Sequence, residues 1–521
     1  MAPVTRRQFL EDVGRGVLAA SVGSGLAVEL GFHGEAFADE QGGALCFGRL
    51  EPLVAMLQET PIDKLLPALA GKLREGTSLR DLTAAGALAN ARTFGGEDYI
   101  GFHTLMALSP AYRMAEEMPE SSKPLPVFKV LYRNTNRIGE KGGRSDEVLK
   151  SIAVEGGPKP ENGGERLRDA VRAKDMEAAE RLFASLSGGA KDGGFNDLLF
   201  AVEDVTEVHR VVLPYRAWDL LDLVGMENAH TLLRQSVRYC VRSEKGNMPE
   251  HYKTPRTLLP KLLDRYGLLG REPGKKSVDD EWVLRMSRTI FESSAESAAE
   301  AVAAALADGM DPDAIAQAIS LAANQLVLRD RGRRENEVQP EKPVGSVHGD
   351  SIGVHACDSA NAWRSMARVS NHRNACACLI LGAYQVALDR VARGGDFLTW
   401  EPHPTRETLE KVRDTAREDL LREADAAIRS KDQARAAALV HRAGESGIDP
   451  RPVFDLLLRY ATSEDGALHA EKYYRTVTEE FRSTRPAFRW RQLCALARVT
   501  ASEYGRTAPG YEEARALLIV A

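Results

Sequence analysis

The feature that most constrains the fold of this chain is that it repeats itself. Residues 98–103 (DYIGFH) return almost unchanged as residues 350–355 (DSIGVH). At the same offset, Tyr132 falls on Tyr384. A period this long is typical of a gene-scale duplication and not of a short solenoid repeat. We therefore expect the chain to fold as two related halves.

A second pair of similar segments divides each half in two. Residues 172–179 (RAKDMEAA) resemble residues 429–436 (RSKDQARA), again at a long offset. The order of segments is thus A, B, A′, B′. The predicted modules are residues 39–154 (A), 155–275 (B), 276–395 (A′) and 396–521 (B′).

The hydrophobic pattern of the chain is helical from Leu50 onward. Leucines and methionines recur at the i, i+3, i+4 spacing of a helix face, and patterns typical of strands are almost absent. Alanine-rich runs add intrinsic helix propensity, at 82–91, 295–307 and 433–440. The predicted fold is all-α, with two tandem halves about a pseudo-two-fold axis. Helices of modules A and A′ are expected to face each other.

Composition excludes several classes of protein. The net charge of −6 argues against a nucleic-acid partner, which normally needs a basic face. Six cysteines in 521 residues are too few for a disulfide scaffold, and no CxxCH motif is present for a covalent c-type haem. No stretch after the N-terminal segment reaches the ~18 apolar residues of a membrane span. We expect no transmembrane span in the mature chain.

The N-terminal segment 1–38 has the features of an export signal. A weakly apolar, Gly- and Ala-rich stretch follows a paired-arginine core, RRQFL, and small residues stand at the −3 and −1 positions of a cleavage site. The residues that carry these features are Arg6, Arg7, Ala36 and Ala38. The segment resembles a bacterial twin-arginine signal peptide. This resemblance implies the twin-arginine translocase as a partner and a periplasmic or secreted mature protein that begins at Asp39.

A histidine recurs near the head of a predicted helix in every module. The four are His103, His209, His355 and His469. Each follows an Asp by one or two turns, and Asp is a favourable helix N-cap. The positive end of the helix dipole disfavours an imidazolium, so these histidines should be neutral, which is the form that binds a metal. Two interpretations stay open: a metal or catalytic role, or polar residues that fill slots between helices.

The candidate metal site is chosen from these histidines and their acidic neighbours. The expected metal ligands are His103, His209, His230 and His355. The carboxylates expected to orient them are Asp98, Asp204, Glu207 and Asp350. His469 is a weaker candidate because its helix is very polar. His230 has no counterpart in the second half, an asymmetry that can mark a single working site. Imidazole ligands suit a transition metal such as iron, copper or manganese.

Two glycines stand at matching places in the repeated phrase. Gly101 and Gly353 each lie two residues before a candidate histidine. Glycine near a helix start costs about 1 kcal/mol relative to alanine. Its presence twice predicts that a neighbouring helix or a ligand approaches the backbone closely there.

The chain beyond the signal resembles an uncharacterised all-helical bacterial family. It is also similar, over short stretches, to the questin-oxidase-like family, whose phrases resemble HTLMAL from His103 and HACDSANA from His355. That resemblance implies an oxygen-using oxidoreductase, with His103, His209 and His355 as the positions carried over.

The function predicted from the sequence is an exported, metal-dependent oxidoreductase that acts on a small organic substrate. The alternative is a non-enzymatic helical scaffold or ligand-binding protein of the periplasm. A metal-free hydrolase built on one His–Asp pair is a third option, but the chain contains no GxSxG nucleophile motif.

Overall fold

The computed structural model describes residues 43–152, 160–188, 190, 192–246 and 248–519. The predicted signal and its cleavage site, with Arg6, Arg7, Ala36 and Ala38, lie outside these residues. Within the described ranges all regular structure is helical, and β pairing is limited to isolated bridges. The predicted all-α class is confirmed.

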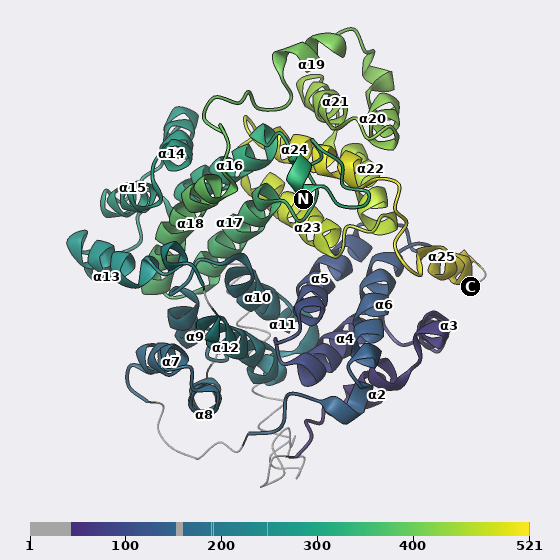
Figure 1. The fold of residues 1–521 in the computed structure, drawn as a ribbon, viewed down its shortest axis with the longest axis vertical. Helices are drawn as coiled ribbons and strands as arrows, with labels where there is room; N and C mark the ends of the chain where they lie inside the picture. The colour runs from purple at the N-terminus through teal and green to yellow at the C-terminus, as the bar shows by residue number, and fades with distance from the viewer. Residues whose placement is uncertain (1–42, 153–159, 189, 191, 247, 520–521) are drawn as a thin grey trace.

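The helices form four groups around a common centre (Figure 1). The first group contains α2 (Glu51–Glu59), α3 (Ile62–Arg74), α4 (Leu79–Phe94), α5 (Tyr99–Glu116) and α6 (Leu125–Glu140). The second contains α7 (Gly163–Arg172), α8 (Met176–Ser187), α9 (Phe195–Val202), α10 (Val208–Asp219), α11 (Leu221–Val224) and α12 (Ala229–Lys245).

The other two groups complete the circle. The third contains α13 (Pro255–Arg265), α14 (Asp280–Glu292), α15 (Ala295–Ala307), α16 (Pro312–Arg329), α17 (Ile352–Val369) and α18 (His372–Arg393). The fourth contains α19 (Arg406–Lys411), α20 (Leu420–Arg429), α21 (Gln433–Glu445), α22 (Pro450–Ser463), α23 (His469–Ser483), α24 (Trp490–Glu503) and α25 (Tyr511–Ile519). The C-terminal helix α25 packs on α3 and α6, which closes the circle. Although α13 lies in the range predicted for module B, it packs on α15 and α18.

Single 3₁₀ turns occur between these helices. They are η1 (Gly48–Leu50), η2 (Gly143–Asp146), η3 (Met226–Asn228), η4 (Glu250–Tyr252), η5 (Leu268–Gly270), η6 (Glu335–Glu337) and η7 (Arg417–Asp419). Local sequence explains where the longer helices start and stop. The side chain of Ser78 caps α4 by accepting from the Asp81 amide, and Gly95 ends it in the left-handed conformation. Asp98 caps α5 by accepting from the Gly101 amide.

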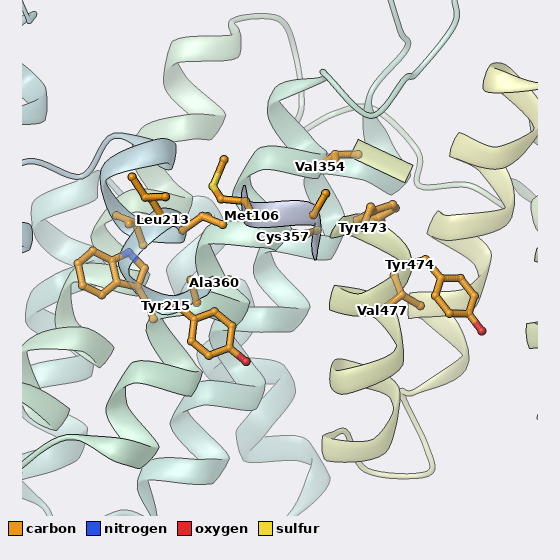
Figure 2. Packing of buried hydrophobic residues seen from close by; sticks show 14 of the residues in the cluster. Met106, Leu213, Tyr215, Val354, Cys357, Ala360, Tyr473, Tyr474 and Val477 are labelled. Atoms are coloured by element: carbon orange, nitrogen blue, oxygen red, sulfur yellow. The ribbon is translucent and has the colours of Figure 1, made fainter. Parts of the chain in front are cut away.

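Four helices, one from each group, form the centre of the molecule. Helix α5 packs against α10 and α23, and α17 packs against the same two helices. Figure 2 shows buried side chains from all four, among them Met106, Leu213, Cys357 and Val477. The helices of modules A and A′ that were expected to face each other, those of His103 and His355, are α5 and α17. Because α10 and α23 each pack against both, α5 and α17 lie diagonally across the bundle.

Helix α18 (His372–Arg393) is long and apolar enough, by length and composition, to cross a membrane. It is the one helix in the described ranges that meets this test, which the sequence prediction had not anticipated. However, 78% of its most apolar window is buried inside the protein, against α15, α17 and other helices. Core helices of large proteins have the same composition.

Candidate functional site

The four central helices bring one histidine each to the same place. His103, His209, His355 and His469 all lie within the first two turns of α5, α10, α17 and α23. The Nε2 atoms of His103 and His209 are 3.2 Å apart, and those of His355 and His469 are 3.1 Å apart. We call these four residues the histidine cluster.

The two pairs of the histidine cluster lie side by side. The ring centroids of His103 and His469 are 5.3 Å apart, and those of His209 and His355 are 6.0 Å apart. Within the pairs, the centroid distances are 4.8 and 5.2 Å. The four imidazoles therefore form a closed ring at the point where four helix N-termini converge.

Hydrogen bonds fix the tautomers of the first pair. Nδ1 of His103 lies 2.7 Å from the carbonyl oxygen of Tyr99, and a carbonyl only accepts, so this nitrogen carries the hydrogen. Nδ1 of His209 donates in the same way to Oε1 of Glu207, at 2.6 Å. In the neutral rings both Nε2 atoms are then lone-pair acceptors that face each other. Two neutral rings in these tautomers form no hydrogen bond with each other, and a proton or a metal ion between the nitrogens would satisfy both.

Glu207 is the carboxylate that supports the histidine cluster. It caps α10 by accepting from the amides of His209 and Arg210, and it also accepts from the Tyr239 hydroxyl at 2.9 Å. Burial raises the pKa of Glu207, but the His209 imidazole and these hydrogen bonds outweigh burial and lower it to about 2. Glu207 is therefore a carboxylate near neutral pH.

Burial keeps three members of the histidine cluster, His103, His355 and His469, uncharged. It lowers the pKa of His355 to about 3, and it holds the pKa values of His103 and His469 well below the ordinary value. The nearby Lys472, one turn along α23 from His469, lowers all three pKa values further. Lys472 is itself buried, and its own pKa falls to about 8 although Asp358 and Glu471 partly offset the burial. Neutral imidazoles are the form that coordinates a metal.

The histidine cluster is close to the surface on one side. The ring of Tyr99 is 62% exposed and lies 4.4 Å from the His103 ring, centroid to centroid. A small cavity of about 50 Å³ reaches His469, and its wall includes His348 and Glu503. A cavity of this size admits only a few molecules as small as water.

The structure brings three of the four predicted ligands together and leaves one out. His103, His209 and His355 belong to the histidine cluster, whereas His230 lies at the start of α12 and stacks on Phe183. Burial and the neighbouring Arg234 lower the pKa of His230 to about 3, and its Nε2 has no hydrogen-bond partner among the described residues.

Of the predicted orienting carboxylates, only Glu207 bonds a histidine. Asp98 caps α5 and pairs with Arg137 instead. Asp204 pairs with Arg172, and Asp350 pairs with Arg333 and Lys342. An Asp was expected to cap each of the four helices, but only Asp98 does so. Glu207 caps α10, Ser351 caps α17, and α23 begins after Leu468 with no side-chain cap. Asp98, Asp204 and Asp350 therefore form ion pairs with arginine or lysine side chains from other helices and loops.

His469 is the cluster residue that the sequence prediction underrated. It is 5% exposed, its Nδ1 has no hydrogen-bond partner in the described part of the chain, and its Nε2 meets His355. Its place in module B′, equivalent to that of His209 in module B, was the signal that pointed to it. The polar composition of α23 concealed it, because much of that polar surface is buried at the centre.

As they stand, the four histidines are two pairs. Across residues 43–519, where described, no group of three or more His, Cys, Asp or Glu side chains is placed to hold a metal ion. Comparisons with protein-family models, with curated proteins and with solved structures find no match to this chain.

Proposed function

We propose that the chain is an exported metal-dependent oxidoreductase whose metal ion is held by the histidine cluster. The observation that carries this proposal is that the Nε2 atoms of His103 and His209 lie 3.2 Å apart. The Nδ1 hydrogen of each ring is already donated in a hydrogen bond, so both Nε2 lone pairs are free to bind an ion. With metal–nitrogen bonds of about 2.0–2.1 Å, such a separation gives an angle of about 100° at the metal, near the tetrahedral value. The residues of this pair therefore fit a shared metal ion.

The second pair supports a single centre of four imidazoles. His355 and His469 present their Nε2 atoms to each other at 3.1 Å, and each ring also lies beside a ring of the first pair. Small rotations of the side chains would turn all four nitrogens toward one ion. An all-imidazole set favours copper or iron over manganese, which prefers carboxylates. Bound copper or iron would supply one-electron redox chemistry.

The surrounding residues have separate parts in this proposal. Glu207 holds the His209 ring by its Nδ1 hydrogen, an arrangement that raises the basicity of a metal-binding imidazole. Lys472, with a pKa of about 8, can hold or release a proton close to neutral pH. The cavity beside His469 has room for a molecule the size of dioxygen. Dioxygen is the proposed electron acceptor, and the resemblance to the questin-oxidase-like family agrees with it.

We also propose that the four-histidine centre arose by duplication of a two-histidine half. The packing partners of the helices support this: α4, α5 and α6 pack on one another, as do α16, α17 and α18. Likewise α12 packs on α7, α8, α9 and α10, and α24 packs on α20, α21, α22 and α23. Lys174 and Lys431, at matching places, both have positive φ, and each precedes an Asp that caps the next helix.

The test is a metal titration of chelator-treated protein under anaerobic conditions. Cu⁺, Fe²⁺, Mn²⁺ and Zn²⁺ are each added, and the bound metal and subsequent oxygen uptake with ascorbate as reductant are measured. We expect about one tightly bound equivalent of copper or iron, and oxygen uptake that requires it. Two equivalents would instead place one ion in each pair and reject a single centre.

The scaffold alternative makes the opposite prediction. If the positive charge between His103 and His209 is only a proton, the protein will bind none of these metals more tightly than a His103→Gln variant does. Loss of metal binding together with loss of helical content in that variant would make the cluster a structural polar core.

A further inference from the structure

A second cavity lies apart from the histidine cluster, among α14, α16, α19, α21 and α24. In Figure 1 these helices lie where the third and fourth groups meet. The cavity has a volume of about 320 Å³, which is within the range of small-molecule sites. We call it the arginine cavity, because its wall includes Arg288, Arg329 and Arg491.

None of these three arginines forms an ion pair with a residue that the structure describes. Arg329 bonds Oε1 of Gln325 and the carbonyl oxygen of Trp400, at 2.9 and 2.6 Å. The side chains of Arg288 and Arg491 form no hydrogen bond with the described residues. Burial lowers the pKa of Arg491, and the charge of Arg288 lowers it further. The two cations therefore repel each other across a partly buried space.

The same wall carries a polar atom without a partner. Nδ1 of His403 is buried and forms no hydrogen bond with the described residues. Burial lowers the pKa of His403 to about 4, so its ring is neutral near pH 7 and can donate or accept one hydrogen bond. A buried polar group of this kind is costly unless something satisfies it.

A larger cavity elsewhere shows that arginines alone do not make such a site. That cavity, of about 710 Å³, is lined by Arg451, Arg459 and Arg515. Each of these three is paired with a carboxylate, on Glu117, Asp425 and Glu512 respectively. Its arginines are ion-paired. The arginine cavity has one carboxylate on its wall, that of Glu292, which acts on Arg329 but forms no ion pair with Arg288 or Arg491.

We propose that the arginine cavity binds a small organic anion through a carboxylate or phosphate head. The guanidinium groups of Arg288 and Arg491 would pair with the head, since the planar fork of arginine matches both oxyanions. His403 would supply a neutral hydrogen bond. The apolar side chains of Leu284, Phe291 and Leu328, on the same wall, would contact the body of the ligand.

Isothermal titration of the whole protein with inorganic phosphate, succinate or glycerol tests this proposal. We expect saturable binding of at least one of the two anions, weakened by added salt, and no binding of neutral glycerol. Binding of phosphate but not succinate would identify the head group as a phosphate, and the reverse would identify it as a carboxylate. Arg491→Gln and, separately, Arg288→Gln should weaken that binding about ten- to a hundredfold, because a hydrogen-bonded charge is lost.

The matched control is Arg285→Gln. Arg285 is an exposed residue of α14 like Arg288, but it is paired with Glu281 and does not line the arginine cavity. The Arg285→Gln substitution should leave anion binding unchanged. Because Arg288 is on the surface, its variant should fold even if Arg491→Gln does not. Absence of saturable anion binding, or equal binding by the Arg288→Gln and Arg285→Gln proteins, would overturn the proposal. Metal content plays no part in this test.

Discussion

At the scale of single residues, the most informative contact is between the Nε2 atoms of His103 and His209, which cannot hydrogen-bond each other while both rings are neutral. The Tyr99 carbonyl and the Glu207 carboxylate each take an Nδ1 hydrogen, so the lone pairs of His103 and His209 meet at 3.2 Å. If the pair served only to pack the core, apolar residues could replace it with little loss of stability, because buried polar groups stabilise a protein only when they are hydrogen-bonded. The proposed metal gives the pair a reason to exist.

Glu207 should matter for metal affinity more than any other carboxylate near the cluster. Glu207→Gln keeps a helix-capping oxygen but removes the charge behind His209, and we expect metal affinity to fall about 10- to 100-fold. Asp98→Asn is the matched control, since Asp98 also caps a cluster helix but bonds Arg137 and not a histidine. Competition with a metal-binding dye measures both. Equal losses in the two variants would contradict the role of Glu207.

The buried histidines should make the metal-free protein sensitive to acid. The pKa of His355 is about 3 in the folded protein and near 6.5 when unfolded, so the unfolded chain binds more protons between these values. Stability from this group is complete above pH 6.5 and is lost as pH falls toward 3. The slope is at most about 1.4 kcal/mol per pH unit for each histidine.

Urea unfolding at several pH values between 7.5 and 5 measures this slope. His355→Gln should lose less stability across the range than the parent protein, whereas His251→Gln, which replaces an exposed histidine, should follow the parent. Identical slopes in all three proteins would show that the cluster histidines do not titrate as described.

Sequence reasoning succeeds at this scale where a contact is local. The Asp98 cap and the nearness of Glu207 to His209 follow from spacings of two or three residues. It fails where tertiary packing determines the partner, as for Asp350, which forms ion pairs with Arg333 and Lys342. Nothing local indicates that His230 stacks on Phe183 while His469 reaches the centre.

At the scale of helices, close backbone approach explains the two repeated glycines. A Cβ at Gly353 would stand 2.8 Å from the backbone of Leu326 on α16, and one at Gly101 would stand 2.5 Å from the Phe94 ring. The predicted close approach is confirmed at both places, and the neighbour is the protein itself. These contacts set how α17 and α5 sit against α16 and α4, and hence where the histidines point.

Alanine substitutions at glycines test this packing. Gly353→Ala should destabilise the protein by about 1–3 kcal/mol, because the obstacle is backbone and cannot turn aside. Gly139→Ala, in α6, meets nothing within 4 Å and should stabilise by up to about 1 kcal/mol. Thermal unfolding compares the two. A neutral or stabilising Gly353→Ala would mean that α16 and α17 are less tightly packed than the structure shows.

Helix existence could be predicted from the sequence, but helix neighbours could not. Apolar periodicity and alanine-rich runs identify the helices, and caps such as Ser78 mark their starts. The diagonal placement of α5 and α17 depends on how α10 and α23 pack between them. The hydrophobic periodicity of one helix does not indicate which helices it packs against. Helix α18 is long and apolar enough to cross a membrane, but neighbouring helices cover most of it.

At the scale of the whole molecule, four groups of helices surround one centre, and the packing of α25 on α3 and α6 closes the circle. Such an arrangement places one residue from each group at a common point. The proposed twin-arginine route carries folded proteins, so a metal centre could be assembled before export. Export is therefore proposed to follow metal loading.

The signal itself can be tested directly. Replacing both Arg6 and Arg7 with Lys should hold the precursor in the cytoplasm, because the paired guanidinium groups are the recognition element. Cell fractionation with immunoblotting measures this, and N-terminal sequencing of the exported protein should begin at Asp39. Normal export of the double variant would reject the twin-arginine interpretation.

The most direct test of the proposed centre is elemental analysis of the purified protein and two histidine variants. His355 belongs to the cluster, whereas His230 is a buried histidine outside it, so His355→Gln and His230→Gln form a matched pair. We expect about one equivalent of copper or iron in the parent and in His230→Gln, and none in His355→Gln, with equal helical content by circular dichroism. A metal-free parent protein, or equal metal content in both variants, would contradict a metal held by the histidine cluster.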